Sequence, residues 1–140
     1  AYVNIPNKKG DSILITAVKG GHRPIIDALL AKFVEIDAIG NMGKTALHYA
    51  IEKGNLDIVR TLLNYKPDLE IATKDGDTPL LLAVKKKSPP IVNELLNNGS
   101  KVSPTDKNGD NALHISLRNR SRDITELILS NPKNSKYLYK

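Results

Sequence analysis

The sequence predicts an all-α solenoid of four helix-turn-helix units joined by hairpin-like loops. The first observation is a period of 33 residues: the string 43–50, GKTALHYA, recurs in the same register at 10–17, 76–83 and 109–116. The second is an aliphatic stripe with the same period, formed by Ile25, Ile58, Ile91 and Ile124. Each isoleucine is followed four and five residues later by two more aliphatic residues, a spacing that places all three on one face of a helix.

Each unit opens with the same signals for a turn and a helix start. A glycine marks a turn where a positive φ is expected (Gly10, Gly43, Gly76 and Gly109). Two residues later stands a side chain whose oxygen can accept from the first-turn N–H groups (Ser12, Thr45, Thr78 and Asn111). The first helix of each unit is therefore expected to begin directly after this cap, and a leucine two positions further on supplies a core row (Leu14, Leu47, Leu80 and Leu113).

The turn to the second helix varies between units. Gly21 and Gly54 predict a left-handed end to the first helix, whereas Lys87 and Arg120 occupy this position later in the chain. A side chain in that conformation costs on the order of 1 kcal/mol, so these two turns are expected to be weaker or differently shaped. The second helices are expected to be capped by Asn55, Ser88 and Ser121, and Pro132 is expected to end the last helix by Asn131.

The period also divides the chain. It predicts the end of a preceding unit at 1–6, units at 7–39, 40–72 and 73–105, and a last unit with a truncated loop at 106–140. Solenoids carry polar replacements of the apolar stripe in their terminal units, and neither end here shows them. We therefore expect a segment of a longer array, with the remaining repeats of the parent chain as neighbours.

The recurring string resembles the ankyrin-repeat signature Thr-Pro-Leu-His-x-Ala, whose period is also 33 residues. Thr78-Pro79-Leu80 and Ala83 match it in the third copy, and Leu47-His48 in the second. The resemblance covers the whole chain. It implies stacked helix pairs and a protein-binding surface, usually concave, made by the loop tips and the exposed side of each first helix.

Strings at mostly variable positions carry a narrower resemblance. Tyr2–Pro6, Ala17–His22, Glu70–Gly76 and Arg120–Arg122 are similar, in this order, to the end of the ankyrin array in the family of ankyrin repeat-rich membrane-spanning proteins, also called kinase D-interacting substrates. Pro89-Pro90 departs from that family and indicates a distant or invertebrate member. The resemblance implies a scaffold of neurotrophin and ephrin receptor signalling on the cytosolic face of the plasma membrane or endosomes. The alternative is an ankyrin module of a nuclear or cytosolic signalling regulator.

The composition excludes several kinds of chemistry. The 140 residues include no cysteine, which removes disulfides, thiolate metal sites and cysteine nucleophiles. His22, His48 and His114 lack the spacing of metal ligands, and no phosphate-binding glycine loop or acid–base pair is present. No apolar run is long enough to cross a bilayer. We therefore expect no enzyme, no cofactor, no metal and no direct membrane contact from this chain.

The basic charge predicts an acidic partner. The net charge is +6, of which residues 71–140 carry +5. In an ankyrin array the binding surface would comprise residues 8–9, 11, 19–20, 41–42, 44, 52–53, 74–75, 77, 85–86, 107–108, 110 and 118–119. We call these twenty residues the loop–helix surface; ten are basic and five acidic, a net of +5. An acidic or phosphorylated extended protein segment is the expected partner, whereas nucleic acid is not expected, because acids are interleaved and few aromatic residues are present to stack on bases.

Fifteen residues are predicted to contact that partner. Tyr49 and Met42 are included as apolar contacts, with Tyr49 expected to be exposed beside cations. The set is Lys8, Lys9, Asp11, Met42, Lys44, Tyr49, Lys53, Lys74, Asp75, Asp77, Lys85, Lys86, Lys107, Asp110 and Arg118.

Two short basic motifs have simpler interpretations that we prefer from the sequence. Lys85-Lys86-Lys87 is typical of a solvated helix end, where cations favour the helix dipole, rather than of a targeting or phosphate-binding patch. Arg118-Asn119-Arg120-Ser121 resembles a site for basophilic kinases, but Ser121 is interpreted first as an unmodified helix cap.

Overall fold

The computed structural model describes residues 5–32 and 34–131, and the predictions that concern Tyr2–Asn4 and Pro132 lie outside these ranges. The described residues form eight α-helices and one short 3-10 helix, so the all-α prediction is confirmed. The chain divides into two compact units, Ala1–Asp68 and Leu69–Lys140.

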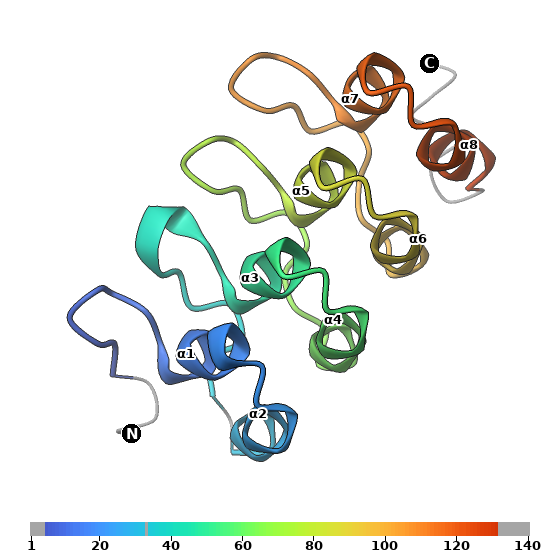
Figure 1. Ribbon diagram of the computed structural model, residues 1–140. Coiled ribbons are helices and arrows are strands. Elements are labelled where there is room, and N and C mark those ends of the chain that lie inside the picture. The colour runs from blue at the N-terminus through green and yellow to red at the C-terminus, as the bar shows by residue number, and fades with distance from the viewer. Residues whose placement is uncertain (1–4, 33, 132–140) are drawn as a thin grey trace. The chain divides into compact units, whose positions relative to one another are not determined.

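Unit 1 contains two helix pairs (Figure 1). The first pair is α1 (Ile13–Gly20) with α2 (Arg23–Leu30), and the second is α3 (Ala46–Glu52) with α4 (Leu56–Leu63). Helix α1 packs against both α2 and α3, and α3 packs against α4. The loops before α1 and α3 extend to the same side of the helices, and the second loop contains the 3-10 helix Asn41–Gly43. The core includes Leu14, Ile15, Leu47, Ile51, Ile58 and Leu62, whereas the predicted stripe residue Ile25 is exposed.

Unit 2 repeats this arrangement. Its pairs are α5 (Pro79–Lys85) with α6 (Pro89–Asn97), and α7 (Ala112–Arg118) with α8 (Arg122–Ser130). Helix α5 packs against α6 and α7, and α8 packs against α6 and α7. Leu80, Leu81, Ile91, Leu95 and Leu96 are fully buried. Leu113 is only half-buried, because no helix follows α8 in the described part to cover this side of α7.

The predicted caps of the first helices are confirmed. The side chains of Ser12, Thr45, Thr78 and Asn111 each accept a hydrogen bond from the third N–H group of the helix that follows. The second helices differ: Asn55 caps α4 by accepting from Ile58 N–H at 3.1 Å, but Ser88 and Ser121 make no such bond. That prediction is wrong for the two serines. The three residues have similar backbone angles, and the shorter serine side chain does not reach where the asparagine side chain does.

The turns within the helix pairs all keep the left-handed backbone. Gly21 and Gly54 have φ values of 71° and 66°, and Lys87 and Arg120 both have a φ of 55°. The expectation of a different shape at Lys87 and Arg120 is therefore wrong. Backbone hydrogen bonds at the end of the first helix, from Ser88 N–H to Ala83 O at 3.2 Å and from Ser121 N–H to Ser116 O at 2.9 Å, hold these two residues in a conformation that costs each about 1 kcal/mol relative to glycine.

Candidate functional site

An ion pair ties each loop to the first helix that follows it. The two charged residues are always eight positions apart: Asp11 with Lys19, Asp77 with Lys85 at 2.6 Å, and Asp110 with Arg118 at 2.7 Å. The second loop has the same pair with the charges exchanged, since Lys44 contacts Glu52 at 2.6 Å. The pair is kept when the two charges are exchanged. What the four loops share is therefore an attraction between loop and helix, and not a particular charge at either position.

These pairs account for all five acids of the loop–helix surface. Four of them lie in the eight-residue pairs, and the fifth, Asp75, contacts Lys107 at 3.0 Å. Five of the ten cations are thereby neutralised by neighbours within the chain. The other five are exposed and form no ion pair in the described part of the chain: Lys8, Lys9, Lys53, Lys74 and Lys86. The net charge of +5 predicted for this surface therefore corresponds to these five residues, which we call the unpaired lysines.

Lys85 makes a second contact that connects two helix pairs within unit 2. Its Nζ lies 2.6 Å from Asp77 and 2.9 Å from Asp106, whose side chain is 2% exposed. Asp106 Oδ1 also accepts from the N–H groups of Asn108 and Asp110. Burial raises the pKa of Asp106, but the hydrogen bonds from Lys85 and from the backbone lower it further, so its pKa lies below the usual value. Asp106 is thus a buried carboxylate that holds the loop before α7 on α5.

Tyr49 is not the exposed anchor that the sequence predicts. Its side chain is 9% exposed and lies under two lysines, with Lys19 Nζ 4.5 Å and Lys44 Nζ 5.5 Å from the ring centroid. Tyr49 is covered because the ion pairs with Asp11 and Glu52 draw both lysines across the ring. Tyr49 therefore positions two paired cations by cation–π contact and offers little surface of its own.

Met42 lies exposed at the tip of the second loop, where a partner can contact it. It is 44% exposed and has a φ of 60°, a conformation that side chains rarely adopt. The loops at Asn7, Thr73 and Asp106 have no such strain, because these side chains accept two backbone N–H groups across the loop. The residue of the second loop that corresponds to Asn7, Thr73 and Asp106 is Gly40, which has no side chain to accept these N–H groups. A Cβ atom at Gly40 would lie 2.6 Å from Asp11 Oδ1.

The loop-capping residues Asn7, Thr73 and Asp106 are not among the residues predicted from the sequence. Their signal is a side-chain oxygen that recurs at positions 7, 73 and 106 in phase with the 33-residue period. They matter for the candidate site because they fix the backbone that carries Lys8, Lys9, Lys74 and Lys107.

Two of the three histidines, His48 and His114, serve as structural caps, whereas the side chain of His22 makes no capping bond. Nδ1 of His48 accepts from Thr45 N–H, and Nδ1 of His114 accepts from Asn111 N–H, each at 3.1 Å. Within residues 5–32 and 34–131, no three His, Asp or Glu side chains are grouped so that they could hold a metal ion. Across the same residues, none of the helices has the length and apolar character needed to span a membrane.

Stacked pairs of short helices, each preceded by a hairpin-like loop, define a repeat protein that presents its loops for binding. The family described as ankyrin repeats (3 copies) matches residues 1–75 and 65–137. The chain therefore belongs to the ankyrin repeat family. It is a protein–protein interaction module, a kind of domain that is typically non-catalytic. No curated protein matches the chain.

The ion pair of Lys44 with Glu52, whose charges are exchanged relative to the other three loops, is expected to contribute to stability. Lys44→Glu and Glu52→Lys are each expected to destabilise the chain by about 0.5–1 kcal/mol, because each places like charges together at a partly exposed site. The double variant restores the polarity seen in the other three loops, so it is expected to recover wild-type stability to within a few tenths of a kcal/mol. Urea unfolding of the four proteins measures this; additive losses in the double variant would contradict the prediction.

Proposed function

We propose that this ankyrin module binds an acidic or phosphorylated extended segment of a partner protein through its unpaired lysines. One observation carries the proposal: within the loop–helix surface, the five acids are satisfied by five cations, which leaves five exposed lysines. A cation already paired within the chain gains less from an acidic ligand than one that faces solvent. The paired residues among the fifteen candidates then hold the loops in place, and the unpaired lysines supply the attraction.

Each unit contributes its own part of this surface. In unit 1, Lys8 and Lys9 border a hollow of about 380 Å³ that Asn7, Asp11, Thr16 and Lys19 also line, and Lys53 follows the end of α3. Met42 adds an exposed apolar side chain on the next loop of the same unit. In unit 2, Lys74 lies at a loop tip and Lys86 follows the end of α5. A partner with carboxylates or phosphates around one apolar residue would match unit 1.

The experiment neutralises the unpaired lysines without disturbing the ion pairs. Lys8, Lys9, Lys53, Lys74 and Lys86 are changed to Gln together, and the control changes Lys32, Lys66, Lys87, Lys101 and Arg120 to Gln. Both variants lose the same charge. The probes are fluorescent twelve-residue peptides: one rich in Asp and Glu, one carrying phosphoserines, and one neutral.

We expect the first variant to bind the acidic peptides at least tenfold more weakly, about 1.4 kcal/mol, and the control to bind them as the wild type does. Fluorescence anisotropy at two salt concentrations measures this. Equal losses in both variants would show that net charge alone attracts the peptides and would refute the proposed surface. Tight binding of random oligonucleotides with a steep salt dependence would instead favour nucleic acid.

For the parent protein we propose a membrane-associated receptor-signalling scaffold of the neurotrophin or ephrin type, a distant or invertebrate member of its family. The support is the order of the strings at Ala17–His22, Glu70–Gly76 and Arg120–Arg122, which resemble the ankyrin repeat-rich membrane-spanning protein. The partner segment would then belong to the cytosolic machinery of a receptor. The coding sequence of the parent tests this: a P-loop region followed by hydrophobic spans supports it, and their absence favours a nuclear or cytosolic regulator.

A further inference from the structure

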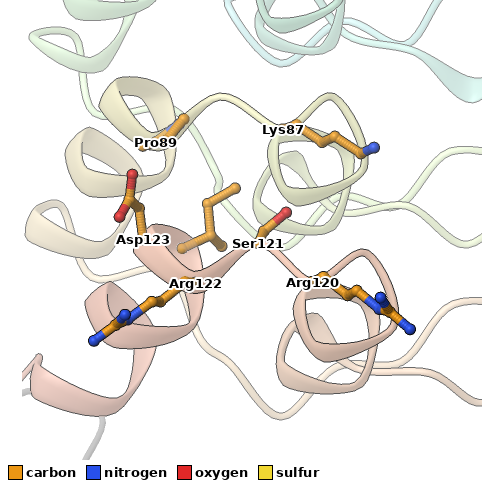
Figure 2. Close-up of a pocket in the computed structure, with 7 residues that line it drawn as sticks. Lys87, Pro89, Arg120, Ser121, Arg122 and Asp123 are labelled. Atoms are coloured by element: carbon orange, nitrogen blue, oxygen red, sulfur yellow. The ribbon is translucent and has the colours of Figure 1, made fainter.

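A basic hollow lies in unit 2 between the turn that joins α5 to α6 and the turn that joins α7 to α8 (Figure 2). Its volume is about 270 Å³, and it is lined by Lys87 and Pro89 from the first turn and by Arg120, Ser121, Arg122, Asp123 and Ile124 from the second. Three cations and one acid thus line it, and one of the cations, Arg122, pairs with Glu126 at 3.1 Å. Neither Lys87 nor Arg120 forms an ion pair among the residues that the structure describes.

Ser121 occupies the centre of this cluster. Figure 2 shows its hydroxyl group between the backbone positions of Lys87 and Arg120, whose side chains extend outward from the hollow. Although Ser121 stands at the start of α8, its hydroxyl does not cap the helix, and no hydrogen bond engages it within the described residues. The two flanking cations replace the glycines found at the same turn in unit 1, at a backbone cost of about 1 kcal/mol each. The hollow therefore offers a hydroxyl without a hydrogen-bond partner among the described residues, with three long cationic side chains rooted on its rim.

We propose that Ser121 is a phosphorylation site for a basophilic protein serine/threonine kinase. The sequence around it supplies cations at three positions that an acidic kinase cleft can bind: Arg118 at −3, Arg120 at −1 and Arg122 at +1. In the reaction, Ser121 Oγ attacks the γ-phosphorus of ATP and the bond to the β–γ bridging oxygen breaks. ADP leaves, and the hydroxyl proton passes to the base of the kinase.

The segment is accessible enough to be recognised. The Arg118 side chain is 65% exposed, and its contact with Asp110 is an exposed ion pair that an acidic residue of a kinase can replace. The left-handed conformation of Arg120 lowers the cost of opening this turn, because the strain is released when the turn extends. The structure thus modifies the sequence-based preference for an unmodified cap, since Ser121 makes no capping bond.

Phosphorylation would connect two helix pairs of unit 2. A phosphoserine carries a charge of about −1.5 to −2 and three strong acceptor oxygens. Here it would lie beside Lys87, which belongs to the preceding pair, and beside Arg120 and Arg122 of its own pair. Asp123 opposes the added charge and Glu126 already pairs with Arg122, but Lys87 and Arg120 remain unpaired in the described part of the chain and outnumber Asp123. The modified chain is therefore expected to melt at a higher temperature than the unmodified chain.

The first test is phosphorylation of the folded chain by a kinase that prefers arginine at −3, with ATP. Mass spectrometry is expected to find one phosphate, on Ser121. Ser121→Ala is expected to abolish it. Ser88→Ala is the matched control, because Ser88 holds the same position one pair earlier and follows three lysines; it should leave the modification unchanged. If the folded chain stays unmodified while a peptide of residues 115–126 is modified, the fold hides the site and the proposal fails.

The second test separates the hollow from the kinase sequence. Lys87 lies 34 residues before Ser121, so Lys87→Ala leaves the recognition sequence intact and should be modified at the wild-type rate. The rise in melting temperature on phosphorylation is then compared within each protein. We expect the rise to be clearly smaller in Lys87→Ala than in the wild type. An equal rise in both would show that the phosphate is not held between the two turns.

Discussion

Replacing Lys85 by methionine is expected to destabilise the chain by about 2–3 kcal/mol. Methionine keeps most of the apolar stem but removes the ammonium that lies 2.6 Å from Asp77 and 2.9 Å from Asp106. Loss of one partner from a buried ion pair costs about 3–5 kcal/mol, because the other charge remains buried without compensation. We take a lower figure because the Lys85 side chain is 33% exposed and Asp106 keeps two backbone hydrogen bonds.

Lys107→Met is the matched control for this prediction. Lys107 also pairs with an aspartate across two loops of unit 2, but its side chain and that of Asp75 are 64% and 56% exposed. An exposed pair of this kind contributes about 0–1 kcal/mol, so the control should lose much less stability. Urea unfolding of both variants measures the difference. Equal losses of unfolding free energy would mean that the contact of Lys85 with buried Asp106 contributes no more than the exposed pair of Lys107 and Asp75.

The same variant should change how stability depends on pH. In the wild type the folded-state pKa of Asp106 is lowered, so its contribution is present above the unfolded value, near 4, and is lost as the pH falls through the lower folded value. Without Lys85, the folded pKa of Asp106 rises. Acid unfolding of Lys85→Met should therefore begin at a higher pH than that of the wild type, in addition to the loss at neutral pH. Circular dichroism between pH 2 and 7 measures both curves.

The features that the sequence predicts well are those that depend on a few neighbouring residues. Ser12, Thr45, Thr78 and Asn111 cap their helices because an N-cap bond needs only a suitable side chain and the next three N–H groups. Ser88 and Ser121 show the limit of the same rule. Residue type predicts the cap position, but the backbone decides whether a serine reaches: Ser12, with a ψ of 166°, forms the bond, whereas Ser88 and Ser121, with ψ values of 90° and 84°, do not.

The electrostatic role of each candidate residue could not be predicted in the same way. Lys85, Lys86 and Lys87 are adjacent and identical in type, yet the first pairs with two aspartates, the second is an exposed candidate contact and the third borders the hollow at Ser121. Their roles depend on which direction each side chain takes at the end of α5. One signal was nevertheless present in the sequence: opposite charges recur eight residues apart in all four units, with the signs exchanged in the second.

Gly76→Ala is expected to destabilise the chain by about 3 kcal/mol, which is the largest effect of any single substitution proposed for the loops. Two costs combine. Gly76 has a φ of +82°, where an L side chain is strained by about 1–2 kcal/mol, and a Cβ atom would lie 2.7 Å from the backbone N of Lys107 and 3.1 Å from backbone atoms of Asp106. These atoms belong to the next loop of unit 2, so the added methyl group pushes apart the backbone that Lys85 and Asp106 hold together.

Gly109→Ala separates the two costs. Gly109 has the same φ of +82° and the same place in its own loop, but a Cβ atom there would meet nothing within 4 Å. The Gly109→Ala variant should therefore lose only the free energy of the backbone strain, about 1–2 kcal/mol. The difference between the two variants in urea unfolding measures how closely neighbouring loops pack. If both alanine variants lose the same free energy of unfolding, the neighbouring loop moves aside at no cost. The loops that carry the unpaired lysines are then not held at a fixed spacing within unit 2.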